Sequence, residues 1–182
     1  TVATPLGTYR FSSIGAAPVS VELARFAALD SDDRDRKVEL ARPGQPLLRY
    51  RLFVPGDTIS LHDVPFRVTR GRASAGGVAP VVYEGAADGV QLRIAYSFVP
   101  DSYQVRVRTD VAGAPAGSFL FLDLAEGLNS SEADVADDQR HLAFAYKPVA
   151  EEASEADVDA ALRDPAHVGR LRGRVHQAWS PR

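Results

Sequence analysis

Hydrophobic and polar side chains alternate along most of this chain. The alternation is longest in residues 90–98 and 103–111, where Val, Leu, Ile, Tyr and Phe are separated by single residues that are mostly polar. A period of two is typical of a strand that packs one face on a core and turns the other to water. Because Pro100-Asp101-Ser102 lies between the two runs, we expect them to form an antiparallel hairpin with a tight turn.

Shorter segments of the same character flank this hairpin, and turn residues separate nearly all of them. The segments are 9–13, 19–26, 37–40, 47–53, 66–70, 81–84, 119–124 and 141–146. Pairs such as Pro55-Gly56 and Gly76-Gly77 break the chain at intervals too short for long helices. Strands this numerous and closely spaced favour two packed antiparallel sheets, so we expect a large all-β sandwich with one or two short helices.

Two acidic, alanine-rich segments interrupt the strand pattern. Residues 130–138 are expected to form an exposed loop or a turn of helix, and residues 151–164 a short helix that begins near Ser154. From Pro165 onward the sequence has four arginines and no acidic residue. This change of charge predicts that residues 1–165 form the sandwich domain. Residues 166–182 would then form a basic edge strand or a linker.

Composition narrows the function classes. The chain has 182 residues, no cysteine, no methionine and a net charge of -3. The absence of cysteine excludes a disulfide scaffold and a thiolate metal site, and no apolar segment approaches the roughly 20 residues of a membrane-spanning helix. A negative net charge without interleaved aromatic residues argues against nucleic-acid binding. The absence of an initiator methionine predicts a processed or excised piece of a longer chain.

Catalytic and metal-binding motifs are missing from the sequence. The histidines, His62, His141, His167 and His176, lack the spacing that presents two imidazoles to one metal. The acidic cluster in residues 30–35 lacks the Gly and Glu positions of a calcium loop, so we expect a solvated turn. Neither a nucleophile elbow nor a phosphate-binding loop is present. We therefore expect no enzyme activity, no metal and no cofactor.

One enzymatic alternative stays open at this point. Glu22, Glu84 and Asp123 lie on or beside strands, and a pair of carboxylates in a cleft could perform acid–base chemistry. Each is also consistent with an outward position on a half-solvated sheet, which we favour. His62, His141 and an acid could alternatively converge on a sugar.

The basic tail is the candidate contact site for a membrane or a partner. It carries Arg170, Arg172, Arg174 and Trp179 within a few residues of one another. Arginines attract anionic lipid, and the ring of a tryptophan is favoured at the headgroup layer. The alternative is that Trp179 closes one end of the core.

The N-terminal residues carry a recognisable motif. It consists of Thr4-Pro5-Leu6, Tyr9-Arg10-Phe11-Ser12, Gly15-Ala16-Ala17 and Val19-Ser20-Val21-Glu22-Leu23. The motif predicts a hairpin in which Gly15 supplies the backbone geometry of the turn. It resembles the opening of the large periplasmic domain of YidC-type membrane protein insertases. The later order of strands, long hairpin and acidic loop is similar to that family as well.

The resemblance implies a fold, a location and a role. The fold would be a large antiparallel supersandwich similar to that of sugar mutarotases, in the periplasmic domain of a bacterial inner-membrane protein. The role would be that of a noncatalytic accessory domain, with translocon components or nascent membrane proteins as partners and the isolated domain a monomer. The same architecture leaves a carbohydrate-binding or mutarotase-like protein as the alternative.

Overall fold

All elements in the described part of the chain are β-strands. The fold is that of a computed structural model, which describes residues 1–136 except 31, 34, 74–76, 100, 125–126 and 135. The strands are β1 (Val2–Thr4), β2 (Gly7–Phe11), β3 (Pro18–Ala27), β4 (Lys37–Glu39), β5 (Leu48–Val54), β6 (Asp57–Ser60), β7 (Arg67–Arg70), β8 (Val81–Ala87), β9 (Val90–Phe98), β10 (Val105–Ala112) and β11 (Phe119–Leu124). The chain divides into the units Thr1–Ala133 and Asp134–Arg182, and the strands all lie in the first.

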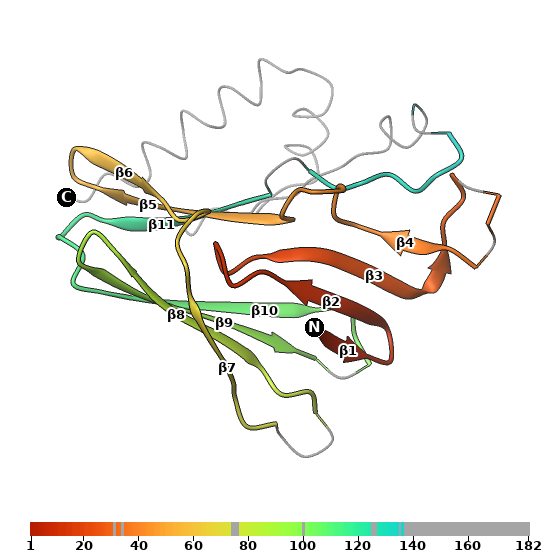
Figure 1. The fold of residues 1–182 in the computed structure, drawn as a ribbon, viewed down its shortest axis with the longest axis horizontal. Coiled ribbons are helices and arrows are strands. Elements are labelled where there is room, and N and C mark those ends of the chain that lie inside the picture. The colour runs from red at the N-terminus through yellow and green to blue at the C-terminus, as the bar shows by residue number, and fades with distance from the viewer. Residues whose placement is uncertain are drawn as a thin grey trace, which may run out of the picture. The chain divides into compact units, whose positions relative to one another are not determined.

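Three antiparallel sheets pack around one core in the first unit (Figure 1). Their strand orders are β1-β2-β3-β4, β10-β9-β8-β7 and β11-β5-β6. The first and third sheets are joined where the Leu47 N–H donates to the Pro18 carbonyl at 2.8 Å. Residues from all three sheets form a single cluster of buried side chains. This arrangement confirms the predicted all-β antiparallel sandwich, which is built from three sheets rather than the expected two.

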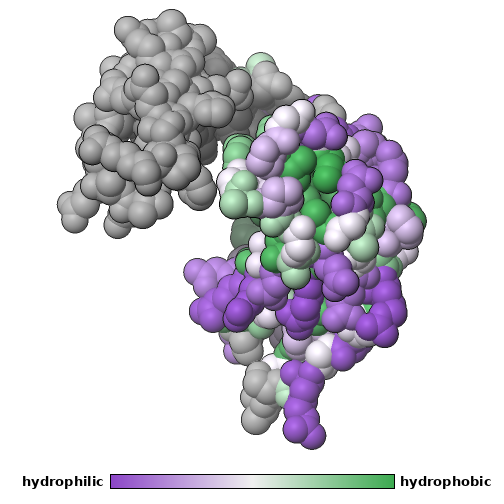
Figure 2. Space-filling model, turned by 90° about the vertical axis from the view of Figure 1, so that its left-hand side faces the viewer, coloured by the Kyte–Doolittle hydropathy of each residue, from purple (hydrophilic) through white to green (hydrophobic). Residues whose placement is uncertain are grey.

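Apolar surface reaches one end of this domain. The β5–β6 and β8–β9 turns lie at the left-hand end in Figure 1. Figure 2 views that end and shows hydrophobic residues gathered in a hollow among hydrophilic ones. The sandwich is therefore not closed by polar side chains there.

The long central hairpin forms from the two predicted runs, with β10 beginning at Val105 rather than at Tyr103. Strand β9 pairs with β10 so that Phe98 faces Val105 and Gln91 faces Ala112. The alternate apolar residues of β9 are all buried, as their period of two predicts. In β10 only Val105 and Val107 are half-buried, and Val111 is exposed. The period is broken there because β10 is the last strand of its sheet in the described part of the chain.

Two short strands escape the sequence pattern. Strand β1 has only three residues, and the four residues of β6 have no apolar alternation. Strand β6 forms because the turn at Pro55-Gly56, with a φ of 85° at Gly56, folds the chain back onto β5. Strand β8 also extends to Ala87, beyond the predicted end at Glu84, and runs through a tight Asp88-Gly89 turn into β9.

The Gly15-Ala16 turn has the geometry that its motif predicts. Strands β2 and β3 pair antiparallel, and the φ of Gly15 is 75°. A Cβ on Gly15 would lie 2.9 Å from the His62 carbonyl oxygen, closer than a carbon can approach. Gly15 is therefore required both by its own backbone and by the loop packed against it.

Charged side chains of alternating sign cross the outer face of the β10-β9-β8-β7 sheet. Arg67 of β7 contacts Glu84 of β8, and Arg93 of β9 lies 3.9 Å from Glu84 and 3.3 Å from Asp110 of β10. Arg108 extends the row at 3.6 Å from Asp110. Each exposed pair stabilises the sheet by well under about 1 kcal/mol. We call these five side chains the charged row.

Glu39 joins β3 to β4 through its side chain. Its Oε1 accepts hydrogen bonds from the backbone N–H groups of Val21 (2.7 Å) and Ala41 (2.9 Å), and its Oε2 accepts one from the Ser20 hydroxyl (2.5 Å). The paired residues of β3 and β4 end at Glu22–Glu39, so Ser20, Val21 and Ala41 lie just past that end. The Glu39 carboxylate provides acceptors for the donors there.

Candidate functional site

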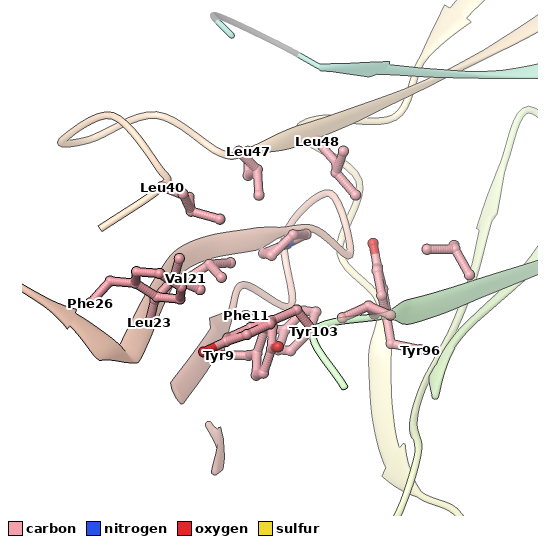
Figure 3. Close-up of a pocket in the computed structure, with 13 residues that line it drawn as sticks. Tyr9, Phe11, Val21, Leu23, Phe26, Leu40, Leu47, Leu48, Tyr96 and Tyr103 are labelled. Carbon is pink, nitrogen blue, oxygen red and sulfur yellow. The ribbon is translucent and has the colours of Figure 1, made fainter. Parts of the chain in front are cut away.

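An open apolar pocket of about 480 Å³ lies where the three sheets meet (Figure 3). Strands β2 and β3 supply one wall, the chain from Leu40 to Leu48 a second, and β9 with β10 a third. The lining residues are Tyr9, Phe11, Pro18, Val21, Leu23, Phe26, Leu40, Leu47, Leu48, Tyr96, Tyr103, Val105 and Val107. Apart from three tyrosine hydroxyls, the side chains of this lining are hydrocarbon.

Two aromatic residues at the pocket are exposed to solvent. Phe26, near the end of β3, is 50% exposed, and Tyr103, just before β10, is 41% exposed. Their ring centroids are 5.8 Å apart and the rings are tilted. Exposed apolar side chains that cluster beside a cavity are a common feature of interaction surfaces. We call Phe26 and Tyr103 the pocket rim.

The deep part of the pocket is formed by a buried tyrosine whose hydroxyl is fully hydrogen-bonded. The Tyr96 hydroxyl donates to the Ala16 carbonyl at 2.8 Å and lies 2.6 Å from the Tyr50 hydroxyl. Both side chains are almost completely buried. With its hydroxyl held inside the core, Tyr96 presents ring surface to the cavity. The pocket therefore suits an apolar group better than a polar one.

Burial also makes this tyrosine network sensitive to alkali. Burial raises the pKa of Tyr50 to about 12, although its hydrogen bond with Tyr96 opposes the rise, and burial raises the pKa of Tyr96 further. Burial raises the pKa of Tyr9 as well, and the neighbouring Tyr103 adds to the effect. The neutral phenol is the form that fits the folded core.

We expect the domain to lose stability above pH 10. The unfolded tyrosines release protons near pH 10, while Tyr50 and Tyr96 keep theirs in the folded state, so the folded state binds more protons. The free energy of unfolding should therefore fall by about 1.4 kcal/mol per pH unit for each such tyrosine, and its full value should hold below pH 10. Urea unfolding between pH 8 and 11.5 measures this slope. Tyr50→Phe should make it shallower, and an unchanged slope would contradict the assignment.

The structure places the candidate carboxylates on separate contacts away from the pocket lining. Glu84 belongs to the charged row, and Asp123 of β11 contacts the Arg51 side chain at 2.7 Å. Glu22 lies opposite Glu39 in the β3–β4 pairing. None of the three lines the pocket. The structure does not bring these acids together as a catalytic pair.

His62 lies in a small polar group on the loop after β6. Its Nδ1 hydrogen-bonds the Ser60 hydroxyl, and its Nε2 lies 2.7 Å from Asp63. The His62 side chain is 53% exposed and that of Asp63 is 83% exposed, so water surrounds both. Among the described residues, no group of three or more His, Asp or Glu side chains is placed to hold a metal ion.

Several predicted sites lie outside the described residues. They are His141, the tail residues Arg170, Arg172, Arg174 and Trp179, the 141–146 strand, residues 135, 137 and 138 of the acidic 130–138 segment, and the 151–164 helix. The domain boundary near residue 165 lies outside them as well and stays a prediction. Within the acidic segment, Ser131 is buried and its carbonyl accepts from the Leu29 N–H at 2.7 Å, whereas Glu132, Ala133 and Asp134 are exposed, as expected of a loop.

The pocket itself could not be found from the sequence pattern. Its residues are spread from Tyr9 to Val107 and belong to three sheets, so only tertiary packing brings them together. One weak signal existed in the sequence. Phe26 lies near the end of β3, and Val21 and Leu23 earlier in this strand already point to the core. Phe26 is out of step with their period of two, so this apolar residue had no expected place in the core.

Fold and pocket together define an antiparallel β-sandwich domain with an open apolar pocket. The family model described as the YidC periplasmic domain matches residues 1–156. The chain therefore belongs to the YidC periplasmic domain family, which confirms the resemblance of the N-terminal motif. No curated protein and no solved structure was found to match the chain.

Membership of this family gives the chain its location. YidC is an inner-membrane protein and its domain of this kind is periplasmic, so the chain is a periplasmic part of a membrane protein insertase. Within the described residues, no helix has the length and hydrophobicity needed to cross a bilayer.

Proposed function

We propose that this domain is a noncatalytic accessory part of the insertase that offers its apolar pocket to nascent membrane proteins or to translocon partners. The observation that carries the proposal is the open, apolar pocket with Phe26 and Tyr103 exposed at its rim. Burying apolar surface in such a pocket is worth about 25 cal/mol per Å². Segments of a membrane protein are rich in the side chains that would gain from this burial.

The pocket lining favours this role over the carbohydrate-binding alternative. Sugar hydroxyls need several hydrogen-bonding partners, and a site that buries them without partners loses binding energy. Only the tyrosine hydroxyls are polar in this lining, and that of Tyr96 is already bonded inside the core. A mutarotase assay or a glycan array that detects turnover or binding would support the alternative instead.

Site-specific photo-crosslinking in the full-length insertase tests the accessory role. A photoreactive residue in place of Phe26 or Tyr103 should crosslink to nascent inner-membrane proteins or translocon subunits during insertion. The same residue in place of Thr69, which is exposed on β7, is the matched control and should give at most one-tenth of that yield. Equal yields at the three positions would contradict the proposal. So would an absence of crosslinks while insertion proceeds.

A further inference from the structure

Strand β10 leaves one edge of its sheet without a partner strand in the described part of the chain. It pairs with β9 on one side and is the last strand of the β10-β9-β8-β7 sheet. The side chains of Thr109 and Val111 are exposed, so this edge is accessible to solvent. An uncovered strand edge carries a row of backbone donors and acceptors that another strand can use.

Hydrogen-bonded and non-hydrogen-bonded residue pairs alternate along the sheet, and this alternation shows which backbone groups face the free edge of β10. The Val99 N–H donates to the Gln104 carbonyl at 3.3 Å, so the bonded pairs of the hairpin continue with Ser97–Arg106 and Ala95–Arg108. The other side of the sheet gives the same result. There the Gly71 N–H donates to the Pro80 carbonyl (2.8 Å), which makes Gly71–Pro80 a bonded pair. Followed through the β7–β8 and β8–β9 pairings, this alternation again leaves the backbone groups of Ser97 and Ala95 facing β10.

It follows that alternate residues of β10 are available to a new strand. The N–H and C=O groups of Val105, Val107 and Thr109 point away from β9. Val105 and Val107 also line the pocket. A strand beside β10 would therefore bond to the same residues whose side chains form the pocket wall, and its own inward side chains would enter the pocket.

The opposite face of β10 carries positive charge. Arg106 and Arg108 alternate with the two valines, are exposed and lie on the outer face. Arg106 has no ion-pair partner among the residues that the structure describes, and Arg108 contacts only Asp110 of its own strand, at 3.6 Å. An added strand would place its outward side chains next to these arginines, where acidic residues are favoured and basic residues are repelled.

We propose that the β10 edge binds an extended peptide as a fifth strand of this sheet. Apolar side chains at alternate positions occupy the pocket, and acidic side chains at the intervening positions lie beside Arg106 and Arg108. The inference rests on the proposed function, because it assigns a conformation and a sequence pattern to what the pocket receives. Backbone pairing supplies affinity, and the two faces of the peptide supply selectivity.

Synthetic peptides test this on the 182-residue chain. The probe is a fluorescein-labelled ten-residue peptide in which Val and Glu alternate, and anisotropy measures its dissociation constant. A peptide with the same composition but with Val and Glu in separate blocks should bind at least tenfold more weakly. In an added strand, only every second backbone N–H of the peptide faces β10. Methylating the backbone nitrogens of either all Val or all Glu residues should therefore abolish binding, while methylating those of the other residue type should change the dissociation constant less than twofold. If both sets or neither set weakens binding, strand addition is overturned.

Two variants test the edge itself. Val107→Pro removes an N–H that points away from β9, which an edge strand tolerates, and should weaken the alternating peptide at least tenfold. Arg106→Glu should weaken the Val–Glu peptide and restore binding of a Val–Lys peptide. This charge exchange does not depend on whether the proline variant folds. Failure of the exchange contradicts the proposed acidic positions.

The outcomes separate this inference from the proposed function. If Val107→Pro in the full-length insertase leaves crosslinking at Phe26 and Tyr103 unchanged, the accessory role stands and strand addition fails. Sedimentation could instead detect dimers of the 182-residue chain that Val107→Pro dissociates. This result would show that the β10 edge pairs with a second copy, and it would also overturn the inference. Loss of both peptide binding and crosslinking in that variant supports the inference.

Discussion

Replacing Tyr96 with alanine should lower the free energy of unfolding by about 4 kcal/mol. Tyr96 is 1% exposed, and its ring lies 4.8 Å from the Phe11 ring and 6.0 Å from the Tyr83 ring, measured between centroids. Truncation would remove these contacts, enlarge the pocket into the core and leave the Ala16 carbonyl without its donor. Urea denaturation followed by circular dichroism measures the effect.

Two other tyrosine variants separate the contributions of the Tyr96 ring and hydroxyl to this loss of stability. Tyr96→Phe keeps the ring but removes the hydroxyl from between Tyr50 and Ala16, so it should cost about 1–3 kcal/mol. Tyr103→Ala changes the exposed pocket rim and should cost less than about 1 kcal/mol. If Tyr96→Ala proves no more harmful than Tyr103→Ala, Tyr96 does not hold the pocket to the core.

Replacing Glu39 with alanine should cost about 3 kcal/mol. The carboxylate accepts from two backbone N–H groups and from the Ser20 hydroxyl, and all three donors would lose their acceptor together. A buried donor without a partner costs about 1–3 kcal/mol, and partial access of water reduces the sum. Thermal unfolding by calorimetry measures the change.

Matched variants separate the acceptor role of Glu39 from its charge. Glu39→Gln retains one acceptor oxygen and should lose about half as much stability as the alanine variant. Glu22→Ala removes the acid directly opposite on β3 and should change stability by less than about 0.5 kcal/mol. A similar loss at Glu22 and Glu39 would show that local charge matters more than these hydrogen bonds.

The sequence predicted the fold wherever one face of a strand is covered. Strand β9 is buried at each alternate apolar position, and the β2–β3 hairpin forms around Gly15 as its motif requires. The pattern failed at β6, which a turn places against β5 without help from apolar side chains. It also failed in the second half of β10, where an edge strand is not covered on its inward face.

The functional surface was much harder to predict than the fold. The sequence motifs that indicate a catalytic site consist of ionisable groups, but Glu84 and Asp123 each contact an arginine, and no candidate acid lines the pocket. The pocket depends on how β3, β5 and β10 meet in space, and the spacing of residues along one strand does not encode that meeting. Family membership, by contrast, was already visible in a short N-terminal motif.

The charged row has a consequence for how the hairpin folds. A one-residue slip between β9 and β10 would turn Val105 and Val107 to water. A two-residue slip that shortens the connecting loop would keep the faces correct but set Arg93 opposite Arg108 instead of Asp110. Like charges in that position repel. The Arg93–Asp110 ion pair therefore adds little to native stability, but it disfavours a misaligned hairpin that hydrophobic burial alone would allow.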